Sequence, residues 1–168
     1  MGITMQNHGG YTETYDNFPE NYYKVGRSYT DANQYLSLVH ESDEAVKNLI
    51  SYFSKVDDPV EIIFFGDHQP SLNSNFYPIL NGKGLTGLTE DELEKLYTVP
   101  FFIWTNYDTP EETVDITSLD YLSTMALERA GIELPAYNKF LADMQEVVPA
   151  INSRGYYSKS KGCYLHID

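Results

Sequence analysis

Asp67 and His68 are the residues whose types and placement most clearly suggest chemistry in this sequence. They follow Gly66 at the end of Val60–Phe65, a mostly apolar run that predicts a strand buried on both faces. Ligands bind beyond the carboxyl ends of the strands in open α/β sheets, so polar residues at this point are candidate site residues. A carboxylate and an imidazole together suit Zn²⁺ or Mn²⁺. The alternative is a turn capped by Asp67, with His68 as an ordinary surface residue.

The chain carries three segments in an order and spacing that are typical of one family: TMQNHGGY at Thr4–Tyr11, FFGDHQPSL at Phe64–Leu72 and VPFFIWTN at Val99–Asn106. Together they resemble the sulfatase-like domain of the lipoteichoic acid synthase and phosphoglycerol transferase family, within the alkaline phosphatase superfamily. The resemblance covers nearly the whole chain. It implies an α/β fold of the three-layer αβα type, of which residues 1–168 are an incomplete, C-terminal part.

The resemblance also implies roles for individual residues. Asp67 and His68 would bind a catalytic divalent cation, Mn²⁺ ahead of Zn²⁺, Mg²⁺ or Ca²⁺, and His8 would contact the substrate phosphate or its glycerol. The alternative for His8 is a loop histidine that caps a backbone group. Gln69 is placed to orient His68. The family's threonine nucleophile has no match by motif, not even at Thr4, so we expect the chain alone to be inactive.

The function implied is transfer of glycerol phosphate from phosphatidylglycerol to a polymer or glycan at the outer face of a bacterial membrane. The expected partners are the upstream half of the same domain and a phospholipid head group or anionic glycopolymer. Two alternatives stay open. One is a sulfatase or phosphoethanolamine transferase of the same superfamily. The other is a non-catalytic domain that binds glycan through tyrosine-rich loops.

Composition narrows the class of partner. The formal net charge is −14, from 11 basic and 25 acidic residues, with no basic run to neutralise phosphates, so nucleic acid is excluded. Cys163 is the only cysteine, so an internal disulfide is impossible. The chain has no signal peptide or transmembrane run, so we expect it to be soluble, with the anchor of the full-length protein upstream of Met1.

Other residues with reactive side chains have simpler interpretations. His40 falls on a solvated helix face, and His166 lies in the C-terminal tail. Cys163 has no basic neighbourhood that would clearly activate its thiol. Trp104 is interpreted as core.

The elements that must position the site alternate between strand and helix, which indicates an α/β architecture. The predicted strands are Gly2–Asn7, Val60–Phe65, Thr98–Thr105 and Cys163–Ile167. The predicted helices are Thr30–Val56, Thr89–Leu96 with a capping box from Thr89 to Glu92, a helix capped by Thr117 or Ser118 that ends at Ala130 before Gly131, and Ala136–Val147. Residues 11–29 and 71–88 are predicted to be loops.

Overall fold

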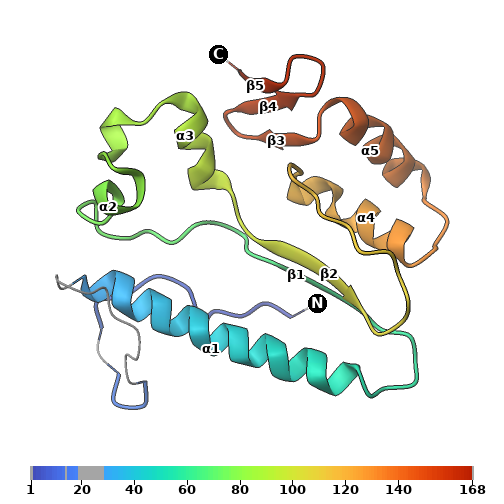
Figure 1. Ribbon diagram of the computed structural model, residues 1–168, viewed down its shortest axis with the longest axis horizontal. Coiled ribbons are helices and arrows are strands. Elements are labelled where there is room, and N and C mark those ends of the chain that lie inside the picture. The colour runs from blue at the N-terminus through green and yellow to red at the C-terminus, as the bar shows by residue number, and fades with distance from the viewer. Residues whose placement is uncertain (1, 14, 19–28, 168) are drawn as a thin grey trace. The chain divides into compact units, whose positions relative to one another are not determined.

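The structure is a computed structural model that describes residues 2–13, 15–18 and 29–167 (Figure 1). The chain divides into two compact units. We call residues 1–56 and 66–99 the helical unit, and residues 57–65 and 100–168 the sheet unit. Each unit is described separately below. Most of the predicted loop at residues 11–29 lies outside the described residues.

The helical unit is organised around helix α1, Thr30–Phe53. Its apolar positions recur at helical spacing, so this helix was predictable from sequence and is confirmed. Two short helices follow, α2 at Tyr77–Asn81 and α3 at Glu90–Glu94, with 3₁₀ turns at Leu85–Gly87 and Lys95–Tyr97. The predicted loop at residues 71–88 therefore contains α2. The capping box at the start of α3 is confirmed, because the Thr89 side chain accepts from the Glu92 amide while the Glu92 carboxylate accepts from the Thr89 amide.

The core of the helical unit is small. Tyr29, Ala32 and Phe76 form its buried cluster, with Leu72 packed against them. The Tyr29 and Phe76 rings meet edge to face, with centroids 5.3 Å apart. The buried positions of α1 are otherwise polar, and they are Asn33, Gln34 and Ser37.

The predicted strand at Gly2–Asn7 is wrong. Residues 2–5 have no regular structure, and residues 6–9 form a turn. Ile3 and Met5 are 76% and 65% exposed. A strand needs a neighbouring strand to pair its backbone groups, and this segment has none among the described residues.

The sheet unit contains two antiparallel sheets. In the first, β1 (Glu61–Phe65) pairs with β2 (Phe101–Thr105), with Ile63 opposite Ile103. The second has the order β3-β4-β5, formed by Ala150–Asn152, Gly155–Ser158 and Cys163–His166. Of these three strands only β5 was expected from the sequence.

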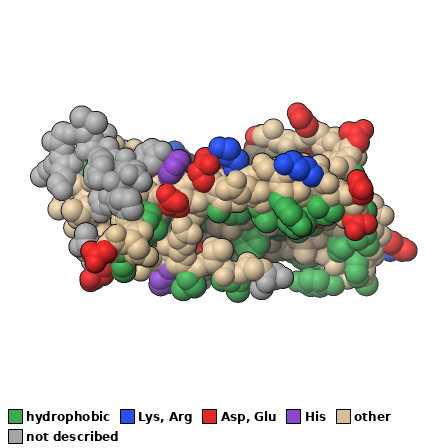
Figure 2. All heavy atoms as spheres, turned by 90° about the horizontal axis from the view of Figure 1, so that it is seen from below, with side chains coloured by type: hydrophobic (Ala, Val, Ile, Leu, Met, Phe, Trp, Pro, Cys, Tyr) green, Lys and Arg blue, Asp and Glu red, His purple; other side chains and the backbone are tan. Residues whose placement is uncertain are grey.

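Strand β1 is not buried on both faces, which corrects the expectation from its apolar sequence. Ile63, Phe64 and Phe65 are 39%, 36% and 44% exposed. Within the described residues this sheet has two strands, and an antiparallel pair can leave apolar side chains open to solvent where no second layer covers them. Hydrophobic side chains also reach the surface on the face that Figure 2 shows, interspersed with acidic ones.

Helices α4 (Leu122–Arg129) and α5 (Ala136–Val147) pack together in the sheet unit. Tyr121, in the 3₁₀ turn before α4, is fully buried and donates a hydrogen bond to the Val148 carbonyl at 2.6 Å. Ser118 was expected to cap this helix. Its hydroxyl instead bonds both the N–H and the C=O of Ile151, at 2.6 and 2.9 Å, so it joins the start of α4 to β3. Gly131 has the predicted positive φ, at 67°.

No helix within the described ranges combines the length and the apolar character that crossing a membrane requires.

Candidate metal and substrate site

His8 lies in a turn that is attached to helix α1. The His8 amide donates to the Met5 carbonyl at 3.1 Å, which closes the turn. The neighbouring Asn7 accepts a hydrogen bond from Ser42 on α1, from Oγ to Oδ1 at 3.0 Å. These two residues are far apart in sequence, so this hydrogen bond is a tertiary contact that limits where the imidazole of His8 can lie.

Tyr11 fixes the other side of the same turn. Its hydroxyl donates to the Asn7 carbonyl at 2.6 Å, and its side chain is only 5% exposed. The ring packs edge to face on Tyr35 of α1, with centroids 5.5 Å apart. Burial raises the pKa of both tyrosines above 10.0, so at neutral pH the Tyr11 hydroxyl stays protonated and can donate.

Asp67 and His68 lie just beyond the end of β1 in sequence and contact each other. The Asp67 Oδ1 accepts from the His68 backbone N–H at 3.0 Å, and Oδ2 lies 3.8 Å from the His68 Nε2. Two ligand atoms of one tetrahedral ion, each about 2.1 Å from it, lie roughly 3.4 Å apart, so a small adjustment would let both bind one cation. The carboxylate caps the local backbone, as the alternative interpretation expected, and its second oxygen faces the imidazole.

The neighbouring Gln69 acts on His68 through its main chain. The His68 Nδ1 lies 2.9 Å from the Gln69 carbonyl oxygen. With a proton on Nδ1 donated to that carbonyl, Nε2 keeps the lone pair that a metal needs, which is the usual arrangement around a ligating histidine. The Gln69 side chain was the expected orienting group. Its Nε2 instead donates to the Thr98 carbonyl and ties this segment to the chain before β2.

The structure brings His8 close to His68, although sixty residues separate them in the sequence. Their rings are 6.4 Å apart between centroids and nearly perpendicular, at 82°. The Asp67 and His68 side chains are 84% and 64% exposed, so the site is open to solvent. Within the described part of the chain no three His, Cys, Asp or Glu side chains are arranged to hold a metal. This chain therefore offers two donors, Asp67 and His68, which fit part of a divalent cation's shell.

The other reactive side chains do not join this group. His40 is half-buried on α1. Cys163 is exposed at the start of β5, and His166 ends the same strand. Trp104 is half-buried in β2 rather than fully in a core.

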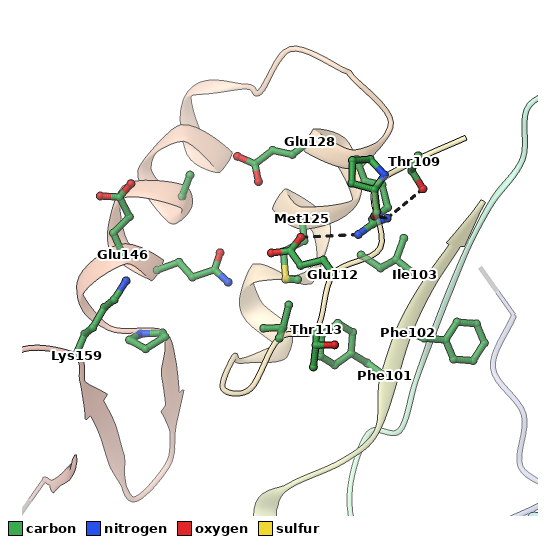
Figure 3. Close-up of a pocket in the computed structure, with 16 residues that line it drawn as sticks. Phe101, Phe102, Ile103, Thr109, Glu112, Thr113, Met125, Glu128, Glu146 and Lys159 are labelled. Atoms are coloured by element: carbon green, nitrogen blue, oxygen red, sulfur yellow. Dashed lines mark hydrogen bonds and ion pairs between the residues drawn. The ribbon is translucent and has the colours of Figure 1, made fainter. Parts of the chain in front are cut away.

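The sheet unit contains a separate open cavity of about 890 Å³, which sequence reasoning did not find (Figure 3). Strand β2, the chain from Thr109 to Val114, α4, α5 and Lys159 all contribute to its walls. No motif marks these residues, because they come from segments that are separate in the sequence. Only the folding of the sheet unit brings them together around one cavity.

The sequence pattern of the sulfatase family matches residues 1–132. A putative cyclic β-1,2-glucan modification protein of Rhizobium meliloti (strain 1021) is 28% identical over 154 residues, which are 87% of this chain and 24% of that protein. The capsular polysaccharide biosynthesis protein RkpI of the same strain is 41% identical over 51 residues, 30% of this chain and 10% of that protein.

Among solved structures, the chain is similar to the Streptococcus pyogenes phosphoglycerol transferase GacH in complex with sn-glycerol-1-phosphate. The TM-score is 0.66 at 19% identity, over 90% of this chain and 37% of that one. The α/β fold class predicted from the sequence is therefore confirmed, in partial form. The chain spans about a quarter of the length of the glucan modification protein.

Proposed function

Since this chain belongs to the sulfatase family, we propose that it is the C-terminal part of the catalytic domain of a metal-dependent phosphoglycerol transferase. In this proposal, residues 1–168 act with the upstream half of the same domain at the outer face of a bacterial membrane. The donor is phosphatidylglycerol, bound through its head group. The acceptor is a glycan or glycopolymer, which is supported by the glucan and capsular polysaccharide named in the descriptions of two relatives.

The observation that carries this proposal is the approach of His8 to His68, at 6.4 Å between ring centroids. Three polar side chains share one exposed location, and they come from two distant segments, each of which resembles one of the family's motifs. Asp67 and His68 would hold the divalent cation, with Mn²⁺ as our choice. That ion would stabilise charge on the phosphoryl oxygens and lower the pKa of a nucleophilic hydroxyl.

The residues of this chain then have distinct tasks. The Gln69 carbonyl orients His68 and keeps its Nε2 directed away from the backbone. Asp67 supplies a negative oxygen 3.8 Å from that nitrogen. His8, fixed by Asn7 and Tyr11, would donate a hydrogen bond to a phosphate oxygen or to a glycerol hydroxyl. Neither histidine is proposed as the nucleophile, because the resemblance to phosphoglycerol transferases implies a threonine in that role, and no motif in this chain matches it.

Mn²⁺ addition tests the metal assignment directly. The chain has four histidines, so their ring signals form a small, separable set in NMR spectra. Substoichiometric Mn²⁺ should broaden the His68 ring signal first and the His8 signal next, and Asp67→Ala should remove the effect. Asp43→Ala, next to His40, is the matched control and should leave it intact. Broadening that begins at His40 or His166 would place the metal elsewhere.

An activity assay tests the transferase assignment. The chain alone should release no glycerol phosphate from phosphatidylglycerol, with or without Mn²⁺, because the nucleophile is supplied from outside it. The full-length protein should be active, and His68→Ala should abolish that activity. Turnover by the chain alone would mean that the nucleophile lies within it, with Thr4 the first residue to test. Release of sulfate in place of glycerol phosphate would indicate a sulfatase, and release of phosphoethanolamine would indicate a phosphoethanolamine transferase.

A further inference from the structure

The cavity of the sheet unit has an apolar base. Phe101 and Ile103 project into it from β2, with Met125 of α4 beside them (Figure 3). The Phe102 side chain extends from the opposite side of the strand, where its ring stacks on Phe64 at 5.2 Å. At about 890 Å³ the cavity has the volume of an ordinary small-molecule site.

One wall of the cavity is held in place by Arg129. Its Nη1 donates to the Thr109 hydroxyl at 3.1 Å and to the Pro110 carbonyl at 2.9 Å, and its Nη2 lies 3.8 Å from a Glu112 carboxylate oxygen. The guanidinium group is therefore engaged by the protein itself. These contacts use both N–H groups of Nη1 and place the positive charge beside the Glu112 carboxylate, so Arg129 shapes the cavity wall.

Three other charged side chains around the cavity are unengaged. Within the described residues, the side chains of Glu128, Glu146 and Lys159 take part in no hydrogen bond or ion pair. Figure 3 shows Glu146 and Lys159 on neighbouring parts of the cavity wall. These groups keep their full capacity to bond a ligand, as acceptors in the two glutamates and as a donor in the lysine.

The side chains that line the cavity disfavour both an anionic ligand and a metal ion. An anion such as a phosphate would meet three carboxylates, on Glu112, Glu128 and Glu146, against two cations, Arg129 and Lys159, so the net charge of the lining repels it. A metal ion would need a group of ligands, and the described residues contain no arrangement of three that could hold one. A neutral ligand with many hydroxyl groups avoids both problems. Its hydroxyls can donate to carboxylates and accept from Lys159, while its C–H faces cover Phe101 and Ile103.

We propose that this cavity, called the glycan cavity from here on, binds a neutral saccharide. The ligand class is a glucan-type oligosaccharide, and its role as the acceptor glycan rests on the transferase proposed above. Phe101 provides the surface on which a sugar ring packs. Glu146 and Lys159 bind hydroxyl groups of the same saccharide from α5 and from the chain between β4 and β5.

Methionine methyl NMR provides a local test, because the chain has four methionines and Met125 lines the glycan cavity. A linear β-1,2-linked gluco-oligosaccharide added to the whole chain should shift the Met125 methyl signal in a saturable manner. The Met5 signal, from the turn segment of the helical unit, should not move. Weak affinity is expected of a single open site, so the titration should extend to on the order of 10 mM.

Paired substitutions assign the contacts. Lys159→Ala and Glu146→Gln should each weaken saccharide binding about tenfold, as expected for loss of one hydrogen bond to a charged group. Lys161→Ala and Asp143→Asn are the matched controls, since these residues lie in the same hairpin and the same helix but do not line the cavity. Both controls should bind as the unchanged chain does.

Several results would overturn the glycan cavity. They are an unmoved Met125 signal across the titration, equal shifts with glycerol phosphate or with a polyamine, and saccharide binding that survives both Lys159→Ala and Glu146→Gln. The histidine ring signals in the same samples report on Mn²⁺ at Asp67 and His68. Failure of the saccharide test with Mn²⁺ binding intact would reject this cavity alone, whereas the reverse would reject the metal site alone.

Discussion

Ser42 and Asn7 connect helix α1 to the turn that carries His8, through a hydrogen bond of 3.0 Å from Oγ to Oδ1. With Tyr11, which bonds the Asn7 carbonyl from the other side, this contact makes α1 the support of the candidate substrate residue. The helix would thus contribute to the site without supplying a ligand to it.

Ser42→Ala should loosen the His8 turn. Removing one partly buried hydrogen bond costs about 1 kcal/mol, so the turn should open roughly fivefold more often. Hydrogen exchange of the His8 amide, which donates to Met5, measures this opening directly. Ser51→Ala, at an exposed position of the same helix, is the control. Equal exchange rates in Ser42→Ala and the unchanged chain would show that the contact does not hold the turn.

Tyr121→Phe should destabilise the sheet unit. The lost hydroxyl leaves the Val148 carbonyl without its donor at a site where the tyrosine is fully buried, which costs about 1–3 kcal/mol. Urea unfolding followed by circular dichroism measures the change. Tyr137→Phe removes a hydroxyl from a side chain that is 69% exposed, and should leave the midpoint unchanged. A Tyr121→Phe midpoint that does not fall would mean that water replaces the donor.

The stability of the helical unit should depend on pH through the Glu92 carboxylate. The hydrogen bond from Lys83, followed by that from the Thr89 amide, lowers the pKa of Glu92 from 4.5 to about 2. The folded state therefore binds this proton less readily than the unfolded state does. The stabilisation from Glu92 is complete above pH 4.5 and is lost as the pH falls toward 2.

Carboxyl ¹³C shifts across this pH range measure the titration of Glu92. Glu92→Gln should reduce the stability of the helical unit at pH 7 and reduce its dependence on acid. Asp91→Asn, on the same turn of α3, is the charge-matched control. A Glu92 midpoint near 4.5 would contradict the pairing with Lys83.

Gly155→Ala should disrupt the β3–β4–β5 sheet. A Cβ atom at this position would lie 2.2 Å from the backbone oxygen of Leu165, so the paired strand must move. Overpacking of this kind costs about 1–3 kcal/mol or more. Gly84→Ala meets no atom within 4 Å and serves as the control. Thermal unfolding compares the two, and a Gly155→Ala variant as stable as the Gly84→Ala variant would contradict the close strand approach.

Local signals account for what the sequence predicted correctly. The apolar spacing of α1 and α5, the capping box at Thr89 and the turn at Gly131 each depend on residues within a few positions of one another. The contact between the Asp67 and His68 side chains is local too, because the two residues are adjacent in the chain, while their role as metal ligands stays a prediction. The motif match for His8 gave a residue that the structure places near them, although no local pattern specifies the distance between the two rings.

The errors arose where distant contacts decide the structure. The segment Gly2–Asn7, predicted to be a strand, has no pairing partner among residues 2–13, 15–18 and 29–167. Ser118 has the side chain of a helix cap, yet its hydroxyl bonds Ile151, which is 33 residues away. The strands β3 and β4 are short and were missed because register across a meander, rather than composition, defines them. The glycan cavity also has no signal in the sequence, because its lining residues come from segments that are distant from one another along the chain.

The open β1–β2 ribbon has a consequence for handling the protein in solution. Within the described residues its two strands have no third neighbour, and the apolar sequence Ile62–Phe65 contains no charge that would discourage pairing. Such an edge is a template on which a second copy can add its own strand. At neutral pH the net charge of −14 keeps copies apart. Self-association should therefore begin on acidification, as protonation of the carboxylates removes the repulsion that protects the ribbon.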